Sequence, residues 1–384
     1  MNPSVHTPPW AAHGGTDAQG VAPHDFSSNA NPLPWPEALR QALASADRRH
    51  YPAPGYEALC EALAAQQGVS ARRIVPTAGS SEAIRRLTLI AHLQGVRTVW
   101  VPQPGYGDYA EAARALGLRV LPCPLGEGAA AVHAGEPVLW WLCDPLNPTG
   151  RLLSAERVAL LAAHLPELPQ GSVVALDLAY EPLRMAPRDD AAWAPVWPQV
   201  WQLWSPNKAL GATGVRAGWL VAPAGLQADS LVQRLWQLAP GWVLSAEGVA
   251  LLQACLLPEV QAWLAQSRAQ LRLWRDDLQG LLKAQGWRVA PTDSHFFLAR
   301  PPEGLRVDAV AWRAQGLKLR DATSLGAPGW WRLSAQGPQA QQALARALSP
   351  VSAQAPVHAP SPDMHAALRT VCSAPATTES GDLP

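Results

Sequence analysis

Short apolar runs that alternate with helical patterns limit the fold of this chain more than any other feature of its sequence. The strand-like runs lie at residues 73–76, 96–101, 119–122, 137–143, 172–178, 200–204 and 217–222. Helical periodicity fills several of the intervals, at residues 81–94, 109–116 and 154–165, and Ser154 is a candidate N-cap. Strands that alternate with helices in this way predict an α/β fold with a mainly parallel sheet of about seven strands.

A different pattern follows the last of these runs. We expect a long amphipathic helix at residues 258–285 and shorter elements at 287–299, 308–315, 317–321, 330–334 and 339–348, which suggest a smaller α+β domain. The predicted division is an N-terminal arm (1–35) that joins the small domain, a large domain (36–257), the small domain (258–348) and a disordered tail (349–384). The tail is rich in Pro, Ala, Ser and Thr.

Composition limits the partners of the chain. Its 384 residues carry 30 basic and 30 acidic side chains, so a strongly basic surface for nucleic acid is not expected. The first residues lack the pattern of a signal peptide, and no run of about 18 residues is apolar enough to span a bilayer. Five scattered cysteines form no CxxC pair and no metal-ligand spacing. We therefore expect a cytoplasmic protein with reduced thiols, no metal and no membrane segment.

Lysine is scarce, so any chemistry that needs an amine has only three candidate residues. Lys283 ends the long helix, where a cation is favoured, and Lys318 lies in a period-2 strand pattern that predicts a solvent-facing side chain. Lys208 instead follows an apolar strand in the small-residue turn SPNKALGATGVRAGW, which also contains Arg216. A desolvated lysine loses its charge easily, and the neutral amine attacks aldehydes. A catalytic amine in this chain would be Lys208.

The run IVPTAGSSEAIRRL passes from a strand through Gly79 into a helix that starts near Ser80 or Ser81. Such a turn exposes free backbone N–H groups and the positive end of the helix dipole, which suit a phosphate group. Taken alone, this fragment favours the simpler interpretation, an ordinary βα turn with serine caps.

Several fragments form a set in a fixed order. They are DFSSNANPLP (25–34), RHYPAPGYEAL (49–59), TAGSSEAI (77–84), PQPGYGDY (102–109), DPLNPTG (144–150), ALDLAY (175–180), SPNKALGATGVRAG (205–218), LRDATSLG (319–326) and WWRLS (330–334). Over residues 13–348 the set resembles fold-type I pyridoxal-phosphate enzymes of the class I/II aminotransferase family, in the branch of threonine-phosphate decarboxylase and histidinol-phosphate aminotransferase. The resemblance implies a pyridoxal 5'-phosphate cofactor.

The resemblance also implies roles for the residues around the cofactor ring. Lys208 would form the Schiff base with the cofactor aldehyde and later move protons at the substrate Cα. Asp177 would pair with the pyridine nitrogen, Tyr180 and Asn147 would hydrogen-bond the phenolic oxygen, and Tyr106 would stack on the ring. Taken singly, Asp177 could be a capping carboxylate, Asn147 a turn residue and Tyr106 plain packing.

The cofactor phosphate would be held by the Gly79–Ser80–Ser81 backbone, Ser205 and Arg216, whose rigid fork suits bidentate contacts. Tyr51 matches a residue that in relatives reaches the phosphate of the neighbouring subunit, which implies a homodimer with shared active sites. Three positions depart from the family pattern: Leu146 and Leu178, and Asn207 in place of a Ser or Thr. With Asn207, the phosphate site is expected to have one hydroxyl fewer.

Four residues are candidates for substrate contacts. By the resemblance, Arg332 would bind the α-carboxylate and Arg320 another anionic group, although a solvated surface arginine is the alternative for either. The opening AHGG would bring His13 close to the substrate anion, and Asn31 would lie near the substrate pocket. For His13, a loop histidine before a Gly-Gly turn is the alternative.

The HGG opening favours a decarboxylase of L-threonine O-3-phosphate that serves cobalamin biosynthesis. The alternative is an aminotransferase for histidinol phosphate or a related amino acid, which would use the same lysine. A catalytically silent binding or regulatory module on this fold is a third reading, but the chain retains the lysine and shows no helix-turn-helix extension. No GxxxxGK[ST] and no GxGxxG after a strand is present, which disfavours a P-loop or dinucleotide enzyme.

Overall fold

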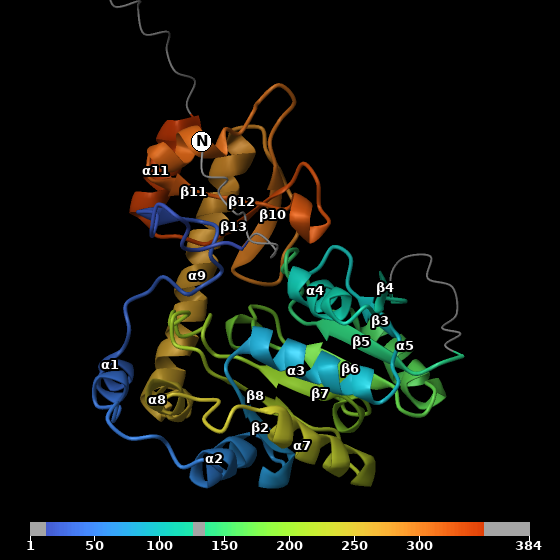
Figure 1. The fold of residues 1–384 in the computed structure, drawn as a ribbon. Coiled ribbons are helices and arrows are strands. Elements are labelled where there is room, and N and C mark those ends of the chain that lie inside the picture. Colours follow the sequence, from blue (N-terminus) through green and yellow to red (C-terminus); the bar gives the residue numbers. More distant parts are fainter. Residues whose placement is uncertain (1–12, 126–134, 349–384) are drawn as a thin grey trace, which may run out of the picture. The chain divides into compact units, whose positions relative to one another are not determined.

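The computed structural model describes residues 13–125 and 135–348, so the predicted tail lies outside the described residues. Figure 1 shows the order of the elements along the chain. A seven-stranded sheet has the order β2-β8-β7-β6-β5-β3-β4. Its strands are β2 (Ile74–Thr77), β3 (Thr98–Val101), β4 (Arg119–Pro122), β5 (Val138–Cys143), β6 (Val173–Asp177), β7 (Trp201–Trp204) and β8 (Gly218–Val221). These strands coincide with the predicted runs to within two residues at each end, and the α/β prediction is confirmed.

One strand breaks the parallel arrangement. Strands β4, β3, β5, β6 and β7 pair in parallel, whereas β8 is antiparallel to both of its neighbours. The segment that joins β7 to β8 is an irregular loop rather than a crossover helix. This loop contains Lys208, so the one antiparallel turn of the sheet brings the lysine back over the strand ends.

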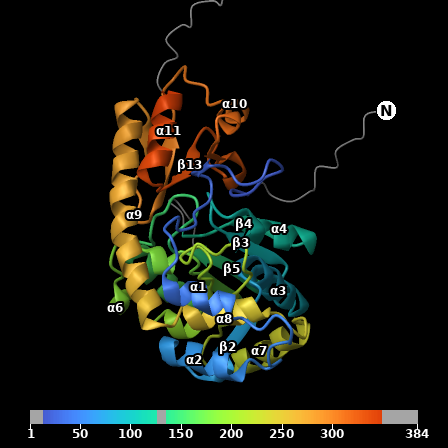
Figure 2. The ribbon, with the colours of Figure 1, turned by 90° about the vertical axis from the view of Figure 1, so that its left-hand side faces the viewer.

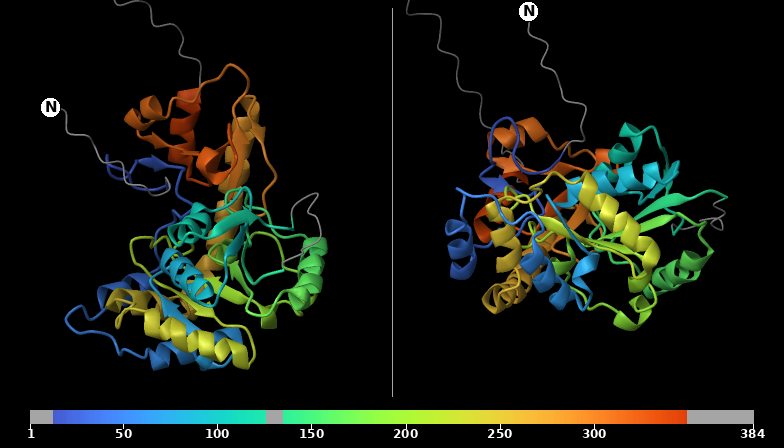
Figure 3. Two further views of the ribbon diagram at one scale, coloured as in Figure 1. Left: turned by 45° about the vertical axis from the view of Figure 1, so that its right-hand side comes forward. Right: turned by 60° about the horizontal axis from the view of Figure 1, so that its bottom comes forward.

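Helices cover both faces of this sheet. One face packs against α3 (Ser80–Leu93), α4 (Gly107–Ala115) and α7 (Leu226–Leu238), and Figure 3 shows α3 and α7 side by side over it. The other face packs against α5 (Ala155–His164) and α6 (Asp190–Trp193). As predicted, Ser154 caps α5 by accepting a hydrogen bond from the Arg157 N–H.

Tryptophan fills the core on both faces. Trp140 and Trp141 follow one another in β5 and point to opposite sides, since successive side chains of a strand alternate. Both are fully buried, as is Trp201. Tryptophan therefore has a packing role in this sheet, which the sequence did not reveal.

A further apolar cluster joins helices from distant parts of the chain. Buried leucines of α1 (Glu37–Ala44), α2 (Glu57–Gln67) and α8 (Ala246–Ala254) pack with the first half of α9 (Pro258–Ala284). The helix at α9 was predicted, but α1, α2, α7 and α8 were not. For α8 the reason is its sequence AEGVALLQA, which is apolar on nearly every side and lacks the contrast that marks an amphipathic helix.

The last part of the chain forms a smaller antiparallel sheet in the order β12-β13-β10-β9. Its strands are β9 (Arg288–Val289), β10 (Phe296–Arg300), β12 (Arg320–Asp321) and β13 (Trp331–Ser334), accompanied by the helices α10 (Ala309–Ala314) and α11 (Pro338–Leu348). Figure 2 shows α9 extending from α8 toward α11. These elements fit the predicted α+β pattern, while the domain boundaries at 35 and 257 stay a prediction.

The N-terminal segment pairs with this later part of the chain. Strand β1 (His24–Asp25) runs parallel to β11 (Leu317–Lys318). The prediction that Lys318 faces solvent is wrong, because its Nζ donates to the Gly15 carbonyl and pairs with Asp17 Oδ2 at 2.7 Å. Lys283 is exposed in the last turn of α9, as expected.

Among the described residues, no single helix is long and apolar enough to cross a membrane. Only α8 and α9 taken together, across a bend of 73°, reach the required length and hydropathy.

Candidate active site

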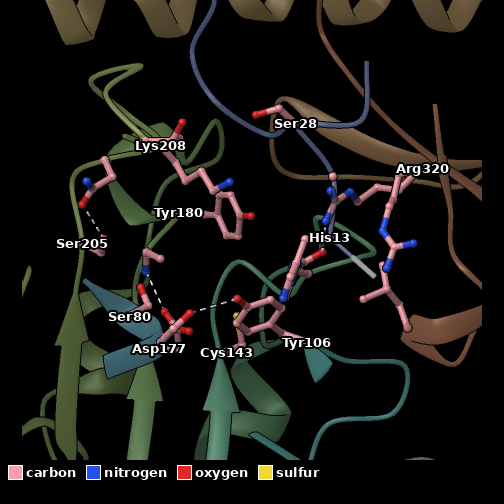
Figure 4. A pocket seen from close by; sticks show the side chains of 18 of the residues that line it. His13, Ser28, Ser80, Tyr106, Cys143, Asp177, Tyr180, Ser205, Lys208 and Arg320 are labelled. Atoms are coloured by element: carbon pink, nitrogen blue, oxygen red, sulfur yellow. Dashed lines mark hydrogen bonds between the residues drawn. The ribbon is translucent and has the colours of Figure 1, made fainter. Parts of the chain in front are cut away.

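A cavity of about 250 Å³ lies where the carboxyl ends of β5 and β6 meet the loop after β7 and the strands of the smaller sheet. Ligands of α/β proteins commonly bind at this edge of a sheet. Figure 4 shows Lys208, Tyr180 and Asp177 on one side of the cavity and His13 and Arg320 on the other. The predicted residues that line it are His13, Ser80, Ser81, Tyr106, Asn147, Asp177, Tyr180, Ser205, Lys208, Arg216, Arg320 and Arg332.

Asp177 is a buried carboxylate at the end of β6. Its Oδ2 accepts a hydrogen bond of 2.7 Å from the Tyr109 hydroxyl, and its Oδ1 accepts one of 2.9 Å from the Ala179 N–H. Burial raises the pKa of Asp177 to about 6, and the hydrogen bonds only partly oppose this rise. A carboxylate held in this way favours a cation, such as a protonated ring nitrogen, in the cavity beside it.

Lys208 reaches the cavity from the loop between β7 and β8. Burial lowers its pKa to about 8, and the positive charges of Arg332 and Arg216 add to the effect. Within the described residues, no hydrogen bond or ion pair from its Nζ is found. The amine is thus available as a nucleophile near neutral pH.

Asn207 explains how this loop keeps its shape. Its Oδ1 accepts a hydrogen bond of 2.8 Å from Ser205, and its Nδ2 donates to the carbonyls of Ala212 and Val215. The amide therefore ties both ends of the loop together, which a serine or threonine hydroxyl could not do alone. Asn207, where the family pattern has Ser or Thr, therefore removes a hydroxyl and also stabilises the loop that carries Lys208.

Tyr180 and Asn147, both predicted to bind the phenolic oxygen of the cofactor, have different hydrogen-bond partners. The Tyr180 hydroxyl accepts a hydrogen bond of 3.2 Å from Asn29, and burial raises its pKa to about 12. The Asn147 Oδ1 accepts a hydrogen bond of 2.7 Å from Arg332, so Nδ2 is the donor that Asn147 can offer to a ligand oxygen. Both side chains can therefore donate hydrogen bonds to an oxyanion in the cavity.

The start of α3 forms a close approach between backbone and guanidinium. Gly79 has φ +85°, and a Cβ at this position would lie 2.4 Å from Nη2 of Arg216. Only glycine fits both this backbone conformation and this contact. Ser80 and Ser81 line the cavity directly after it, so the N-terminus of a 14-residue helix and an arginine face the same space. That combination suits a phosphate group.

A buried carboxylate that the sequence analysis did not single out lies beside this helix start. Asp108 Oδ2 accepts hydrogen bonds of 2.6 Å from Ser81 and 2.8 Å from the Tyr106 hydroxyl. Its Oδ1 is buried without a hydrogen-bond partner among the described residues and lies 3.6 Å from His13 Nε2. The Ser81 hydroxyl is therefore engaged by Asp108, and its backbone N–H is the group that remains for a phosphate.

Two buried arginines form the far wall of the cavity. Arg332 donates 2.7 Å to Asn147 Oδ1 and 2.6 Å to the Ser27 carbonyl, and in the described part of the chain it pairs with no carboxylate. Arg320 donates 2.6 Å to Ser324 Oγ. Burial lowers the pKa of both arginines, and the charge of Arg332 contributes to the shift at Arg320. Two buried cations at one wall create a strong preference for anionic groups.

Three predicted residues do not line the cavity: Gly79, which lies against Arg216, and Asn31 and Tyr51. Asn31 is buried, but its Nδ2 donates to the Ala209 carbonyl and its Oδ1 accepts from the Leu33 N–H, so it fixes the chain behind Lys208. Asn31 does not line the cavity, and its proximity to the substrate stays a prediction. Tyr51 is 74% exposed and stacks on Trp242 with ring centroids 4.1 Å apart. It lies in a separate hollow that also contains Arg216.

The leucine departures have packing roles. Leu178 is fully buried in the cluster under α5, and Leu146 packs against the cluster under α3. Neither position offers a polar group to the cavity.

Tyr109 and Asp108 were not predicted as site residues, although both lie in the PGYGDY fragment that contains Tyr106. Tyr106 is the N-cap of α4, and Asp108 and Tyr109 lie in the first turn of that helix, so their place beside Tyr106 was the available signal. The cavity also includes Gly14, Ser27 and Thr213, for which their neighbourhood to predicted residues was the only indication.

The family model for aminotransferase class I and II matches residues 22–348. The chain belongs to the class I and II aminotransferases. Members of this family depend on pyridoxal phosphate. The chain is 30% identical over 346 residues to histidinol-phosphate aminotransferase 2 of Ralstonia nicotianae, an alignment that covers 86% of this chain and 89% of that protein.

Solved structures of the family have the same fold. L-threonine-O-3-phosphate decarboxylase from Porphyromonas gingivalis matches with a TM-score of 0.68 at 23% identity, over 84% of this chain and 97% of that one. A histidinol-phosphate aminotransferase from Sinorhizobium meliloti, in complex with pyridoxal-5'-phosphate, matches with a TM-score of 0.67 at 23% identity, over 83% and 88%. At these identities the likeness establishes the fold-type I architecture of the chain.

The cavity fits the family's cofactor. The cofactor needs a partner for each of three groups. The buried carboxylate of Asp177, whose pKa is raised, suits the ring nitrogen, and Lys208, which has no partner in the described residues, suits the aldehyde. The glycine turn that faces Arg216 suits the phosphate.

Proposed function

We propose that this enzyme decarboxylates L-threonine O-3-phosphate to (R)-1-aminopropan-2-yl phosphate, a step of cobalamin biosynthesis. In this reaction the bond between Cα and the carboxylate breaks, CO₂ leaves, and a proton takes its place on Cα. The single observation that carries the proposal is the position of the HGG segment. His13 and Gly14 line the cavity, and a Cβ on Gly14 would lie only 3.2 Å from Nη2 of Arg332.

The residues that would hold the cofactor divide into three groups. Lys208 would bind its aldehyde carbon, Asp177 its ring nitrogen, and Tyr180 with Asn147 its phenolic oxygen. Tyr106 would lie against the ring, while the N–H groups at the start of α3, Ser205 and Arg216 would hold its phosphate. When bound, the cofactor withdraws electrons from the substrate Cα.

Orientation of the substrate decides which bond at Cα breaks, because only the bond perpendicular to the ring plane is activated. Two anionic groups held apart by separate cations would fix that orientation. Arg332 and Arg320 are two such cations on one wall, and His13 approaches the same space from the N-terminal segment. In the proposed arrangement they share the phosphate and the carboxylate of the substrate.

Lys208 would then supply the proton. With a pKa of about 8 it exchanges protons readily near neutral pH, and it lies on the cavity wall that carries Tyr180. Delivery of this proton to Cα completes the decarboxylation.

Transamination of histidinol phosphate is the second candidate function. It is favoured by the name of the Ralstonia nicotianae relative, at 30% identity. The two candidates share the cofactor residues and differ in the bond that breaks: the carboxylate bond in one reaction, the Cα–H bond in the other.

A parallel assay separates them. The purified, cofactor-loaded protein is incubated with L-threonine O-3-phosphate alone and, separately, with histidinol phosphate and 2-oxoglutarate. The proposal expects CO₂ and an amine from the first mixture and no glutamate from the second. Glutamate formation in the second mixture, with no CO₂ from the first, would assign the aminotransferase function instead.

A further inference from the structure

The N-terminal segment carries His13 and Gly14 into the cavity, and hydrogen bonds on both sides of Gly15 hold it there. Its start is fixed at Gly15, whose N–H donates a hydrogen bond of 2.9 Å to Ser27 Oγ. The carbonyl of the same residue accepts a hydrogen bond of 2.5 Å from Lys318 Nζ. Both sides of Gly15 are therefore anchored, and His13 lies two residues away.

Lys318 depends in turn on Asp17. Its Nζ lies 2.7 Å from Asp17 Oδ2, and Arg313 binds the same carboxylate with Nε at 3.0 Å and Nη2 at 3.1 Å. Arg313 also donates to the Gly20 carbonyl, and Asp17 and Gly20 close a turn through two backbone hydrogen bonds. One carboxylate thus joins the N-terminal turn to α10 and β11.

The pKa of Asp17 reflects how strongly these two cations bind its carboxylate. The hydrogen bonds from Arg313 and then Lys318 hold the pKa of Asp17 well below its usual range. Asp17 remains outside the cavity and does not contact its lining, so its effect on a ligand must pass through Lys318 and Gly15.

We propose that Asp17 is a positioning residue for substrate binding: by fixing Lys318 on the Gly15 carbonyl, it holds His13 and Gly14 at the anion-binding wall of the cavity. The inference rests on the proposed function only in that the ligand at this wall is an anionic group of the substrate.

The sign of the charge makes the proposal testable. Asp17 is an anion, and Asp17→Asn frees two cations near the cavity. A purely electrostatic role predicts tighter binding of anions by the variant. A positioning role predicts weaker binding, because the segment that carries His13 is released.

The experiment measures the dissociation constant of inorganic phosphate by calorimetry on the cofactor-loaded protein, whose own phosphate site is filled. We expect Asp17→Asn to raise this constant about fivefold to tenfold, the size of one ordinary hydrogen bond lost between the displaced segment and the anion. Asp17→Glu, which keeps the charge on a longer side chain, recovers part of the affinity. Glu37→Gln is the matched control: it removes one charge from an exposed ion pair with Arg40 and leaves the constant unchanged.

Coupling to His13 completes the test. If Asp17 acts through the segment, the double variant His13→Gln/Asp17→Asn binds phosphate no more weakly than the weaker single variant. Additive effects, an unchanged or lower dissociation constant in Asp17→Asn, or no phosphate binding to the wild type would each overturn the proposal. Since no substrate is turned over, a failed decarboxylation assay would leave this result intact, and the reverse also holds.

Discussion

Burial disfavours the charged forms of Asp177 and Lys208, so the pKa of each is shifted from its ordinary value. The carboxylate is buried at the end of β6 with a pKa raised to about 6, and the amine is desolvated with a pKa lowered to about 8. Each would be relieved by the group that it would bind, a ring cation for Asp177 and an electrophilic carbon for Lys208. Shifted pKa values of this kind are typical of functional sites.

Asp177→Asn tests the cost of this burial through stability. A carboxyl whose folded pKa exceeds its unfolded value of 3.8 costs stability above pH 6, and the cost disappears as the pH falls toward 4. The cofactor-free variant should therefore be more stable than the wild type at pH 8, by about 3 kcal/mol at most, and equal to it near pH 4. Denaturant unfolding at several pH values measures this. A variant that is less stable than the wild type at pH 8 would contradict this prediction. The activity of the cofactor-loaded variant should fall about a hundredfold or more.

Lys208 gives a second prediction from pH dependence. Covalent loading of the cofactor requires the neutral amine, so its rate should rise with pH around a midpoint near 8 rather than 10.5. Because the charge of Arg332 contributes to the lowered pKa, Arg332→Gln should move the midpoint upward. Arg320→Gln, at the same wall, should leave it unchanged. Borohydride reduction and peptide mapping report the loaded residue, and a label on Lys283 or Lys318 would contradict the assignment.

At the scale of single residues, the sequence predicted which side chains meet but not how they are bonded. Twelve of the fifteen predicted site residues line one cavity, since their fragments have a fixed order in the family. Gly79 does not line it but fits against Arg216. The bonds of Asp108 to Ser81 and of Asn207 across its loop depend on tertiary distances that no local pattern contains.

At the scale of elements, the turn into α3 is the most constrained feature. Gly79→Ala would place a Cβ 2.4 Å from the Arg216 guanidinium at a φ of +85°. We expect it to cost about 1 kcal/mol or more of stability and to raise the dissociation constant of the cofactor at least about tenfold. Gly68→Ala is the control, because Gly68 also has positive φ (+62°) but open space around it. Equal losses of cofactor affinity in both variants would contradict a specific role for Gly79.

The elements that sequence could predict are those with strong contrast. The seven strands are short apolar runs with polar turns between them, and α9 has a clear amphipathic period. Helix α8 was missed because its apolar side chains lie on nearly every side and its partners are distant in the sequence. Helices α1, α2 and α7 were also missed, although α1 and α7 are amphipathic. The antiparallel direction of β8 was also unforeseen, because direction follows from the path of the connecting loop.

At the scale of the whole molecule, Tyr51 and Trp242 form an exposed aromatic pair beside Arg216, with 74% and 47% of their surfaces accessible. An exposed stacked pair next to a cofactor site suits a subunit interface. We predict a homodimer, with light scattering giving twice the 41.0 kDa of the chain. Tyr51→Arg should shift it to monomer and release cofactor, while Leu273→Arg, an exposed leucine on α9, should not. A wild-type monomer that retains cofactor would contradict the prediction.

The central claim is that the cavity breaks the carboxylate bond of its substrate and leaves the Cα–H bond intact. The most direct test follows the Cα hydrogen of L-threonine O-3-phosphate by NMR during turnover in D₂O. Decarboxylation predicts an aminopropanol phosphate whose amine-bearing carbon keeps the original hydrogen and gains one deuterium. Loss of the original hydrogen, with formation of a keto acid that depends on an amino acceptor, would contradict the account.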